Sequence, residues 1–153
     1  MAKGASIKFT SYEESVPKLL KILNLPRELK KYDSIVLKVK LSPPDEMRDG
    51  EMLTEQDYSL GFIESALKFI LKEKNPVANV YIAEGADGYS TEELFNLSGY
   101  QKLADKYDVG LIDLNNTETE QIENPKFSKF EKIQYPKILL NSFVISISKP
   151  EES

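Results

Sequence analysis

Two acids, two glycines and a serine stand where an apolar run of the sequence gives way to a helical pattern. Gly85 and Gly88 could let backbone N–H groups approach an anion, and a helix that begins at Ser90 would add unpaired donors and the positive end of its dipole. Glu84 and Asp87 oppose this, because two carboxylates repel an anion unless a divalent cation lies between them. A site in which Mg²⁺ or Mn²⁺ bridges the protein and an anionic ligand accommodates both features.

The chain contains no Cys and no His, which restricts its chemistry. Without Cys it has no thiolate nucleophile, no thiolate zinc site and no cysteine-held iron–sulfur cluster, and we expect no haem. Without His it has no Ser-His-Asp arrangement and no imidazole metal ligand. Any bound metal must therefore accept oxygen ligands, and acid–base chemistry depends on Asp, Glu, Lys or Tyr.

Composition also bounds the partners and the location. The net charge is −5 and the pI about 5.0, so the chain lacks a broad basic surface, and we expect no nucleic-acid partner. It has neither a run of roughly 20 apolar residues nor a signal-peptide start, so we expect no membrane association and a soluble, cytoplasmic protein. The many Lys, Glu, Ile and Tyr residues resemble the composition of hyperthermophile proteins.

The elements that must position these groups alternate between strand and helix patterns. Apolar and β-branched runs predict strands, and apolar residues three and four apart predict helices. Capping boxes at Thr54 with Asp57 and at Ser90 with Glu93 mark two helix starts, and Gly99 splits the second helix into two shorter ones. The expected strands are 6–10, 34–41, 80–83, 109–114 and 143–148, the expected helices are 16–23, 54–74 and 90–107 with a helical turn or two at 136–141, and the polar run 115–131 is a long loop.

Strands separated by helices argue for repeated β-α-β units, whose right-handed crossovers give a mainly parallel sheet. The strands are apolar on both faces, as a sheet with helices on each side requires. A chain of 153 residues, 41% of them hydrophobic, is long enough for one domain with its own core. The predicted fold is a single α/β domain over residues 1–153: a Rossmann-like, three-layer α/β/α sandwich with a mainly parallel sheet of about five strands, whose order stays open.

Ligands of open parallel sheets bind beyond the carboxyl ends of the strands, where loops and helix N-termini gather. Lys38 and Lys40 lie near the end of one predicted strand with their side chains on the same face, and Asp113 lies near the end of another. We therefore expect acidic and basic groups to meet at one edge of the sheet. The candidate ligand-binding residues are Lys38, Lys40, Glu84, Gly85, Gly88, Ser90 and Lys149, the candidate metal ligands are Glu84, Asp87 and Asp113, and Ser42, Asp45 and Asn115 belong to the same predicted edge.

Each of these residues also has a structural interpretation. Glycines after a strand commonly occupy positions that need a positive φ, and Ser90 caps a helix whether or not a ligand binds. Loop acids are usually solvated, Asp113 could simply terminate a strand, and Lys38 with Lys40 could form an exposed strand face. The tyrosines, Tyr107 among them, are more often core-edge residues than catalysts. No dinucleotide or phosphate-loop glycine motif is present, so the sequence gives no support to a nicotinamide or nucleotide site.

Four segments along the chain form a recognisable succession. They are LKVKL at 37–41, AEG at 83–85, GYQKLADKYDVGLIDLN at 99–115 and PKILLNSFVISISK at 136–149. This succession resembles the domain-of-unknown-function family 362 of bacteria and archaea, in which I-K-P-N-L, G-E-G, G-Y-x-x-L-A-x-x-Y-G-V-x-L-V-D-L-N and P-K-L-L-L-x-S-D-F-V-I-S-V-P-K-L-K-T-H follow one another. The order agrees along most of the chain.

The resemblance implies little biochemistry, because the family's activity is largely unassigned. Many members carry ferredoxin-type clusters in additional Cys-rich segments, which implies redox or metal-linked roles, and a chain without Cys cannot hold such clusters. Val39 and Lys40 replace the family's Pro-Asn, and the family's second half would follow just after Lys149. We therefore expect either a short homologue or the first part of a longer protein.

Two functions remain open from the sequence. The first is an α/β domain that binds a small anionic molecule with the help of a divalent cation, the acids serving as metal ligands and the lysines as anion contacts. The second is a non-enzymatic interaction or scaffold domain that forms a homo-oligomer, or pairs with a redox partner, through an exposed edge strand.

Overall fold

The structure, a computed structural model, describes residues 4–40, 60–85, 90–123 and 132–147. Its strands are β1 (Ser34–Lys38), β2 (Asn79–Glu84), β3 (Gly110–Asp113), β4 (Thr119–Glu123), β5 (Lys132–Pro136) and β6 (Phe143–Ser146). Its helices are α1 (Tyr12–Ile22), α2 (Leu25–Leu29), α3 (Leu60–Glu73), α4 (Thr91–Ser98), α5 (Tyr100–Tyr107) and α6 (Lys137–Leu140). Four strands form a parallel sheet in the order β3-β2-β1-β6, and β4 pairs with β5 in a separate antiparallel pair.

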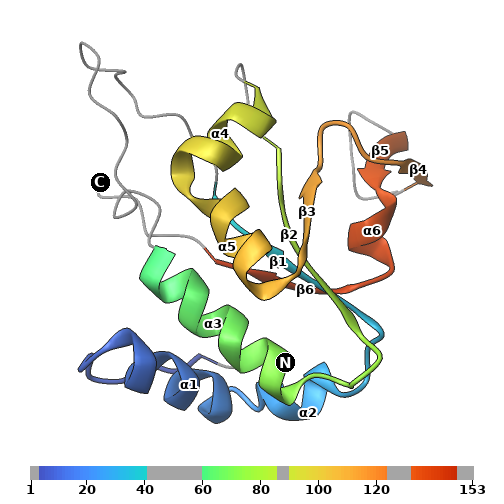
Figure 1. Ribbon diagram of the computed structural model, residues 1–153. Helices are drawn as coiled ribbons and strands as arrows, with labels where there is room; N and C mark the ends of the chain where they lie inside the picture. The colour runs from blue at the N-terminus through green and yellow to red at the C-terminus, as the bar shows by residue number, and fades with distance from the viewer. Residues whose placement is uncertain (1–3, 41–59, 86–89, 124–131, 148–153) are drawn as a thin grey trace, which may run out of the picture.

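This arrangement confirms the predicted α/β fold with a parallel sheet, although the sheet has four strands rather than about five. Figure 1 shows α3, α4 and α5 on one side of the sheet and α6 with the β4–β5 pair on the other. The strand order explains these positions. The chain steps from β1 to β2 to β3 in one direction, so right-handed crossovers place the intervening helices on one face, and the return to β6 beyond β1 reverses that direction.

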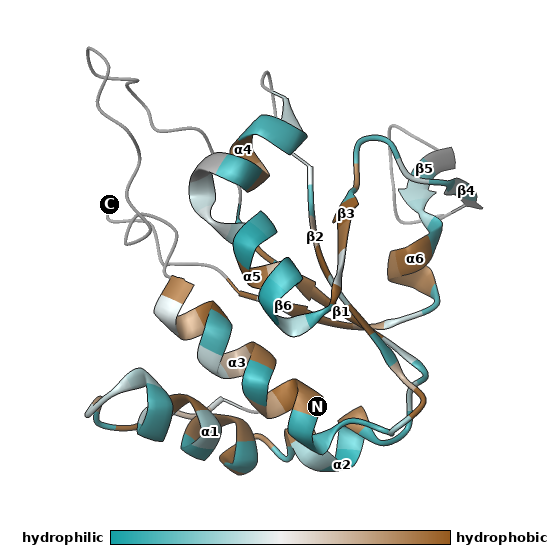
Figure 2. Cartoon of the chain, in the orientation of Figure 1, coloured by the Kyte–Doolittle hydropathy of each residue, from teal (hydrophilic) through white to brown (hydrophobic). Residues whose placement is uncertain are grey.

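The core lies between the parallel sheet and the layer of helices formed by α1, α3, α4 and α5. Ile35 and Leu37 of β1 and Ile82 of β2 are fully buried there. Helix α3 contributes Ile63 and Leu67, which are four residues apart and therefore lie on the same side of the helix. Figure 2 shows the strands of the parallel sheet as mostly hydrophobic segments. Complete burial of one such side chain stabilises the fold by about 1.5–3 kcal/mol.

Gly99 separates α4 from α5, as the sequence predicts. Its φ is 92°, a left-handed conformation that a residue with a Cβ adopts only at a cost. The other end of α4 is closed by Ser90, whose hydroxyl accepts a 3.3 Å hydrogen bond from the backbone N–H of Glu93. The capping serine and the glycine at C′ thus fix where this helix begins and ends.

The N-terminal prediction is wrong at two points. No strand forms at residues 6–10, and the first helix begins at Tyr12 rather than near residue 16. The reason is local capping: the backbone N–H of Thr10 donates to the hydroxyl of Ser15 at 2.9 Å, and the hydroxyl of Ser11 accepts from the N–H of Glu14 at 3.2 Å. These side-chain bonds turn the chain into the helix and compete with strand pairing.

The long loop predicted at 115–131 is also partly wrong, because it contains β4, which pairs with β5. The sequence of β4, TEQIE, is polar at four of its five positions and so lacks the apolar alternation that predicts a strand. The strand forms because its backbone pairs with β5, in a register that places Thr119 opposite Pro136 and Glu123 opposite Lys132.

Among the helices built from described residues, none has the length and apolar character needed to cross a membrane.

Candidate functional site

The last residues of the parallel strands lie along one edge of the sheet, as the prediction required. Lys38 ends β1, Glu84 ends β2, Asp113 ends β3 and Ser146 ends β6. Because the four strands run in the same direction, their carboxyl ends share this edge. Segments far apart in the sequence therefore bring acidic and basic residues to one end of the molecule.

Glu84 and Asp113 are the closest pair of candidate residues at this edge. They are register partners in the parallel β2–β3 pairing. Their backbones are therefore about 4.8 Å apart, and their side chains leave the sheet on the same face. Lys38 is the register partner of Ala83 and of Ser146. Since successive residues of a strand face opposite sides, Lys38 lies on the other face from the two acids.

Asp113 organises the turn that follows β3. Its Oδ1 accepts a 2.9 Å hydrogen bond from the backbone N–H of Asn115, and its Oδ2 accepts a 2.7 Å bond from the side-chain amide of Asn116. The backbone N–H of Asn116 also donates to the carbonyl of Asp113 at 3.1 Å. This is an Asx-type turn, so the structural interpretation of Asp113 has a physical basis. A carboxylate has about four acceptor positions, and the two bonds to its oxygens leave capacity for a cation.

Gly85 is needed for a close approach at this edge. A Cβ at this position would lie 2.7 Å from Cγ and 3.0 Å from Nδ2 of Asn115, so the exposed Asn115 side chain would have to move. The side chain of Asn115 therefore lies against the Gly85 backbone and joins the segment after β2 to the turn after β3. The N–H of Gly85 donates a 3.0 Å hydrogen bond to Oε1 of Glu84. The N–H that was predicted to approach an anion thus already has a carboxylate partner.

Ser90 is exposed at the start of α4, which runs for eight residues. Its hydroxyl serves as the helix cap, and Glu92 and Glu93 occupy the first turn. Those acids complement the helix dipole and reduce the attraction of this N-terminus for an anion. Lys40, which follows β1, is exposed, and Lys38 is partly buried.

The carboxyl ends of β1 and β6 mark the point where the strand order reverses. From β1 the chain steps through β2 to β3, whereas β6 lies on the opposite side of β1. In open α/β sheets the crevice for a ligand forms at such a reversal, because the loops on either side lead to opposite faces. Lys38 lies beside it, and Glu84 belongs to the adjacent strand.

The predicted metal centre is described only in part. Asp87, Gly88 and Lys149, like Ser42 and Asp45, lie outside the described residues. Within the described parts of the chain, no three Asp or Glu side chains come together in a way that could hold a metal ion. Two of the three predicted metal ligands, Glu84 and Asp113, are neighbours, and both offer the oxygen donors that Mg²⁺ and Mn²⁺ prefer.

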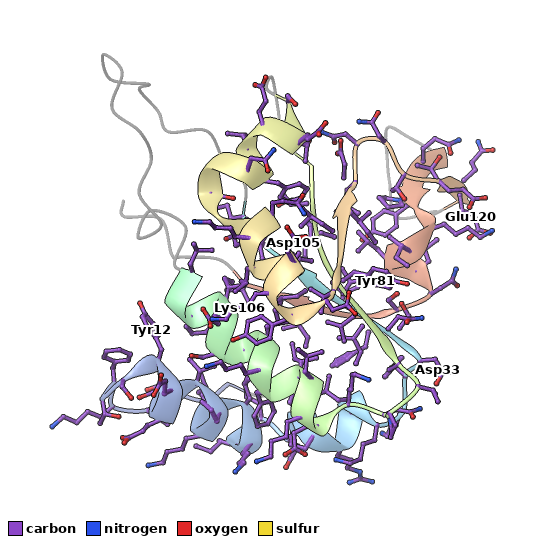
Figure 3. All side chains as sticks on the ribbon, viewed as in Figure 1. Tyr12, Asp33, Tyr81, Asp105, Lys106 and Glu120 are labelled. Atoms are coloured by element: carbon purple, nitrogen blue, oxygen red, sulfur yellow. The ribbon has the colours of Figure 1, made fainter. Side chains whose placement is uncertain are left out.

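A second polar cluster, joining α3 to α5, was missed by the sequence analysis. Oε1 of Glu64 accepts a 2.6 Å hydrogen bond from the hydroxyl of Tyr107 and a 2.9 Å bond from Nζ of Lys106. Figure 3 shows Lys106 where α5 passes α3. These residues are more than forty positions apart, so no local pattern could have indicated the contact.

Ionisation in this cluster follows from its hydrogen bonds. The bonds from Tyr107 and Lys106 lower the pKa of Glu64, since they favour its charged form. The same carboxylate raises the pKa of Lys106, whereas burial and then the bond to Glu64 raise the pKa of Tyr107. A phenol whose pKa is raised is a poor base at neutral pH, so the cluster supports a structural role in joining two helices.

Comparison with known proteins gives no relative from which a function could be transferred. The chain matches no protein-family model, and searches of curated proteins and of solved structures likewise find no match. The resemblance to the domain-of-unknown-function family 362 therefore stays a prediction.

Proposed function

We propose that the protein binds a small anionic molecule at the carboxyl edge of its parallel sheet, with Mg²⁺ or Mn²⁺ held by Glu84 and Asp113. The observation that carries this proposal is the register of β2 and β3, which makes these two acids neighbours on one face. Two adjacent carboxylates repel each other by an amount that depends on solvent exposure, and a divalent cation between them removes that repulsion.

The hydrogen bonds of the two acids are compatible with a bound cation. Glu84 accepts from Gly85, and Asp113 accepts from Asn115 and Asn116. These bonds orient the carboxylates and leave acceptor positions on each. Mg²⁺ commonly uses one or two protein carboxylates and completes its shell with water and ligand oxygens. When bound, the cation would supply the positive charge that lets a phosphate or carboxylate group approach two acids.

Lys38 at the end of β1 and Lys40 just after it bring positive charge to this end of the sheet. Lys38 lies at the end of β1, one strand from Glu84 and beside the reversal of strand order. Lys40 follows two residues later and is exposed. Because Lys38 lies on the other face of the sheet from the two acids, these ammonium groups would contact a ligand that extends from the cation over the ends of the strands. The sequence contains no Cys or His, so its side chains can offer a metal ion oxygen ligands but no thiolate or imidazole.

The test is a thermal-shift titration with Mg²⁺ and Mn²⁺, each alone and combined with a panel of phosphorylated and carboxylated metabolites. A ligand at a hundred times its Kd stabilises the folded state by about 2.7 kcal/mol, which raises the Tm of a chain of this size by about 5 °C or more. We expect such a shift with at least one combination of cation and anion. No shift with any of them would contradict the proposal.

Variants test whether the shift in Tm comes from binding at this edge. Glu84→Gln and Asp113→Asn keep the size of each side chain and remove its charge, and both should lower cation affinity by tenfold or more, as on the order of 1.4 kcal/mol per lost charge contact implies. Lys38→Gln should weaken binding of the anion and leave the thermal shift caused by the cation unchanged. Asp105→Asn is the matched control, because Asp105 is an exposed acid on α5 whose carboxylate accepts only from Gln101 among the described residues.

A further inference from the structure

Strand β6 lies at an edge of the parallel sheet. In the order β3-β2-β1-β6 its only strand partner among the described residues is β1. An edge strand presents a row of backbone donors and acceptors, and proteins usually protect it with charged residues, proline or a bulge.

The direction of each backbone group in β6 follows from one hydrogen bond. The N–H of Ile147 donates to the carbonyl of Lys38 at 2.9 Å, so Ile147 points its backbone groups toward β1. In a parallel strand the N–H and C=O of one residue point to the same side, and those of the next residue point to the other side. Phe143 and Ile145 therefore bond toward β1, and the backbone groups of Val144 and Ser146 point outward.

The described residues of this edge strand contain no charged side chain and no proline. Residues 141–148 read NSFVISIS, with no charge and no proline. The opposite edge strand, β3, ends in Asp113, whose carboxylate holds the turn that follows. Pairing through β3 would carry that charge into the contact, whereas pairing through β6 introduces no charge.

The side chains of β6 are apolar on the face covered by helices. Phe143 and Ile145 on β6, and Ile147 just after it, are only partly buried, and Ile145 and Ile147 pack at the margin of the core. The ring of Tyr32, which is 39% exposed, lies against Phe143 with ring centroids 5.1 Å apart. Among the described residues, this edge therefore combines outward backbone groups that no other strand pairs with and partly exposed apolar side chains.

We propose that β6 pairs antiparallel with β6 of a second copy of the chain, about a two-fold axis at Ile145. In this register Val144 exchanges both of its outward hydrogen bonds with the partner's Ser146, and Ile145 faces the partner's Ile145 in a pair without hydrogen bonds. The result is a continuous sheet of eight strands.

A second copy fits this edge because the edge is complementary to itself. The two-fold axis places Phe143 opposite the partner's Ile147 and Ile145 opposite the partner's Ile145, so the apolar side chains on this face meet one another. No charge on one strand meets a like charge on the other. The proposal is independent of the anion site, because it uses the outer side of β6 and not the acids of β2 and β3.

The first test compares Ser146→Pro with Ser146→Ala by sedimentation velocity over a range of concentrations. The wild-type chain should sediment with twice the mass of its 17.4 kDa monomer. Proline removes the outward N–H of an exposed residue without touching a bond to β1, and edge strands tolerate proline. We expect Ser146→Pro to raise the dimer dissociation constant at least about tenfold, because two symmetric hydrogen bonds are lost. Ser146→Ala, which keeps the N–H, should dimerise like the wild type.

The second test uses the absence of Cys, which makes any introduced thiol unique. Ile145→Cys should form an intersubunit disulfide on mild oxidation, since residues in an antiparallel pair without hydrogen bonds have Cα atoms about 4.5 Å apart. Ser146→Cys is the control, because the neighbour of Ser146 is the partner's Val144 and the two thiols introduced by this substitution would be too far apart. This test decides the question if Ser146→Pro does not fold.

Amide hydrogen exchange locates the contact. The N–H groups of Val144 and Ser146 should be protected in the wild type and exchange quickly in any monomeric variant. A wild-type chain that stays monomeric up to about 1 mM overturns the proposal, and so does a dimer that leaves these two amides unprotected or that cross-links through Ser146→Cys but not Ile145→Cys.

Discussion

The hydroxyl of Tyr107 on α5 donates a 2.6 Å hydrogen bond to the carboxylate of Glu64 on α3. The two helices belong to successive β-α-β units, and this partly buried bond joins them. It is shorter than an ordinary neutral hydrogen bond, as a bond to an ionised acceptor should be. The stability of this layer therefore depends on a polar contact as well as on the apolar core beneath it.

Removal of this hydroxyl should destabilise the fold measurably. Tyr107→Phe keeps the ring and deletes the donor, so we expect a loss of about 1 kcal/mol in the free energy of unfolding, measured by urea denaturation. Tyr12→Phe is the control, because it deletes an exposed hydroxyl on α1 and should change stability by less than about 0.5 kcal/mol. Equal effects of the two substitutions would contradict a stabilising role for the Tyr107 bond.

The same cluster should give the protein a pH dependence at acidic pH. The pKa of Glu64 is lowered in the folded state, chiefly by the bonds from Tyr107 and Lys106, so its contribution to stability is fully present above the unfolded pKa. That contribution is lost as the pH falls below about 4.5 and through the lower, folded pKa. Glu64→Gln cannot ionise, so the stability difference between wild type and variant should be larger at pH 6 than at pH 3. Urea midpoints at both pH values measure it, and a constant difference would show that Glu64 is not the linked group.

Replacement of Gly85 should cost less when Asn115 is shortened as well. Gly85→Ala places a methyl group against the Asn115 side chain, and we expect a cost of about 1–3 kcal/mol. In an Asn115→Ala background the obstructing atoms are gone, so the same substitution should cost much less. A double-mutant cycle by thermal denaturation measures this coupling. Additive effects would mean that the two residues do not share this contact.

The turn after β3 should depend on both oxygens of Asp113. Asp113→Ala removes the acceptors for Asn115 and Asn116 and should destabilise the fold by about 1–2 kcal/mol. Asp113→Asn keeps one acceptor and lowers the repulsion with Glu84, so we expect a smaller loss in the absence of metal. Guanidinium unfolding curves in the presence of a chelator provide the comparison. If Asn proves as costly as Ala, charge rather than hydrogen bonding holds the turn.

The sequence carried enough information for the sheet and for α3, because their patterns are apolar and regular. Ile35, Leu37 and Ile82 belong to continuous apolar runs, which are typical of strands in a sheet with helices on both faces. Gly99 indicated a break between two helices, and its φ of 92° explains that break. The sequence patterns predicted the wrong structure where tertiary contacts decide the conformation. Strand β4 is polar and exists through its pairing with β5, and the N-terminal segment is turned by Ser11 and Ser15 instead of pairing as a strand.

The candidate site, too, could be predicted from the sequence only in part. Chain direction alone places Lys38, Glu84 and Asp113 at one edge, since parallel strands end together. The face of the sheet on which each of these side chains lies depends on the register between strands. The sequence of a single strand does not determine that register. The hydrogen bond of Glu64 to Tyr107 depends on how two helices pack, and the sequence holds no local signal for it.

The pairing of β1 with β6 has a consequence for how the chain acquires its structure. Ser34 and Ser142, whose hydroxyl oxygens lie 2.6 Å apart at the start of these strands, are separated by 108 residues. Strands β1, β2 and β3 can associate once β3 has been synthesised, but β1 can pair with β6 only after residues 143–146 have followed. During that interval β1, an inner strand of the described sheet, is an edge strand, and an unpaired strand edge favours misassembly.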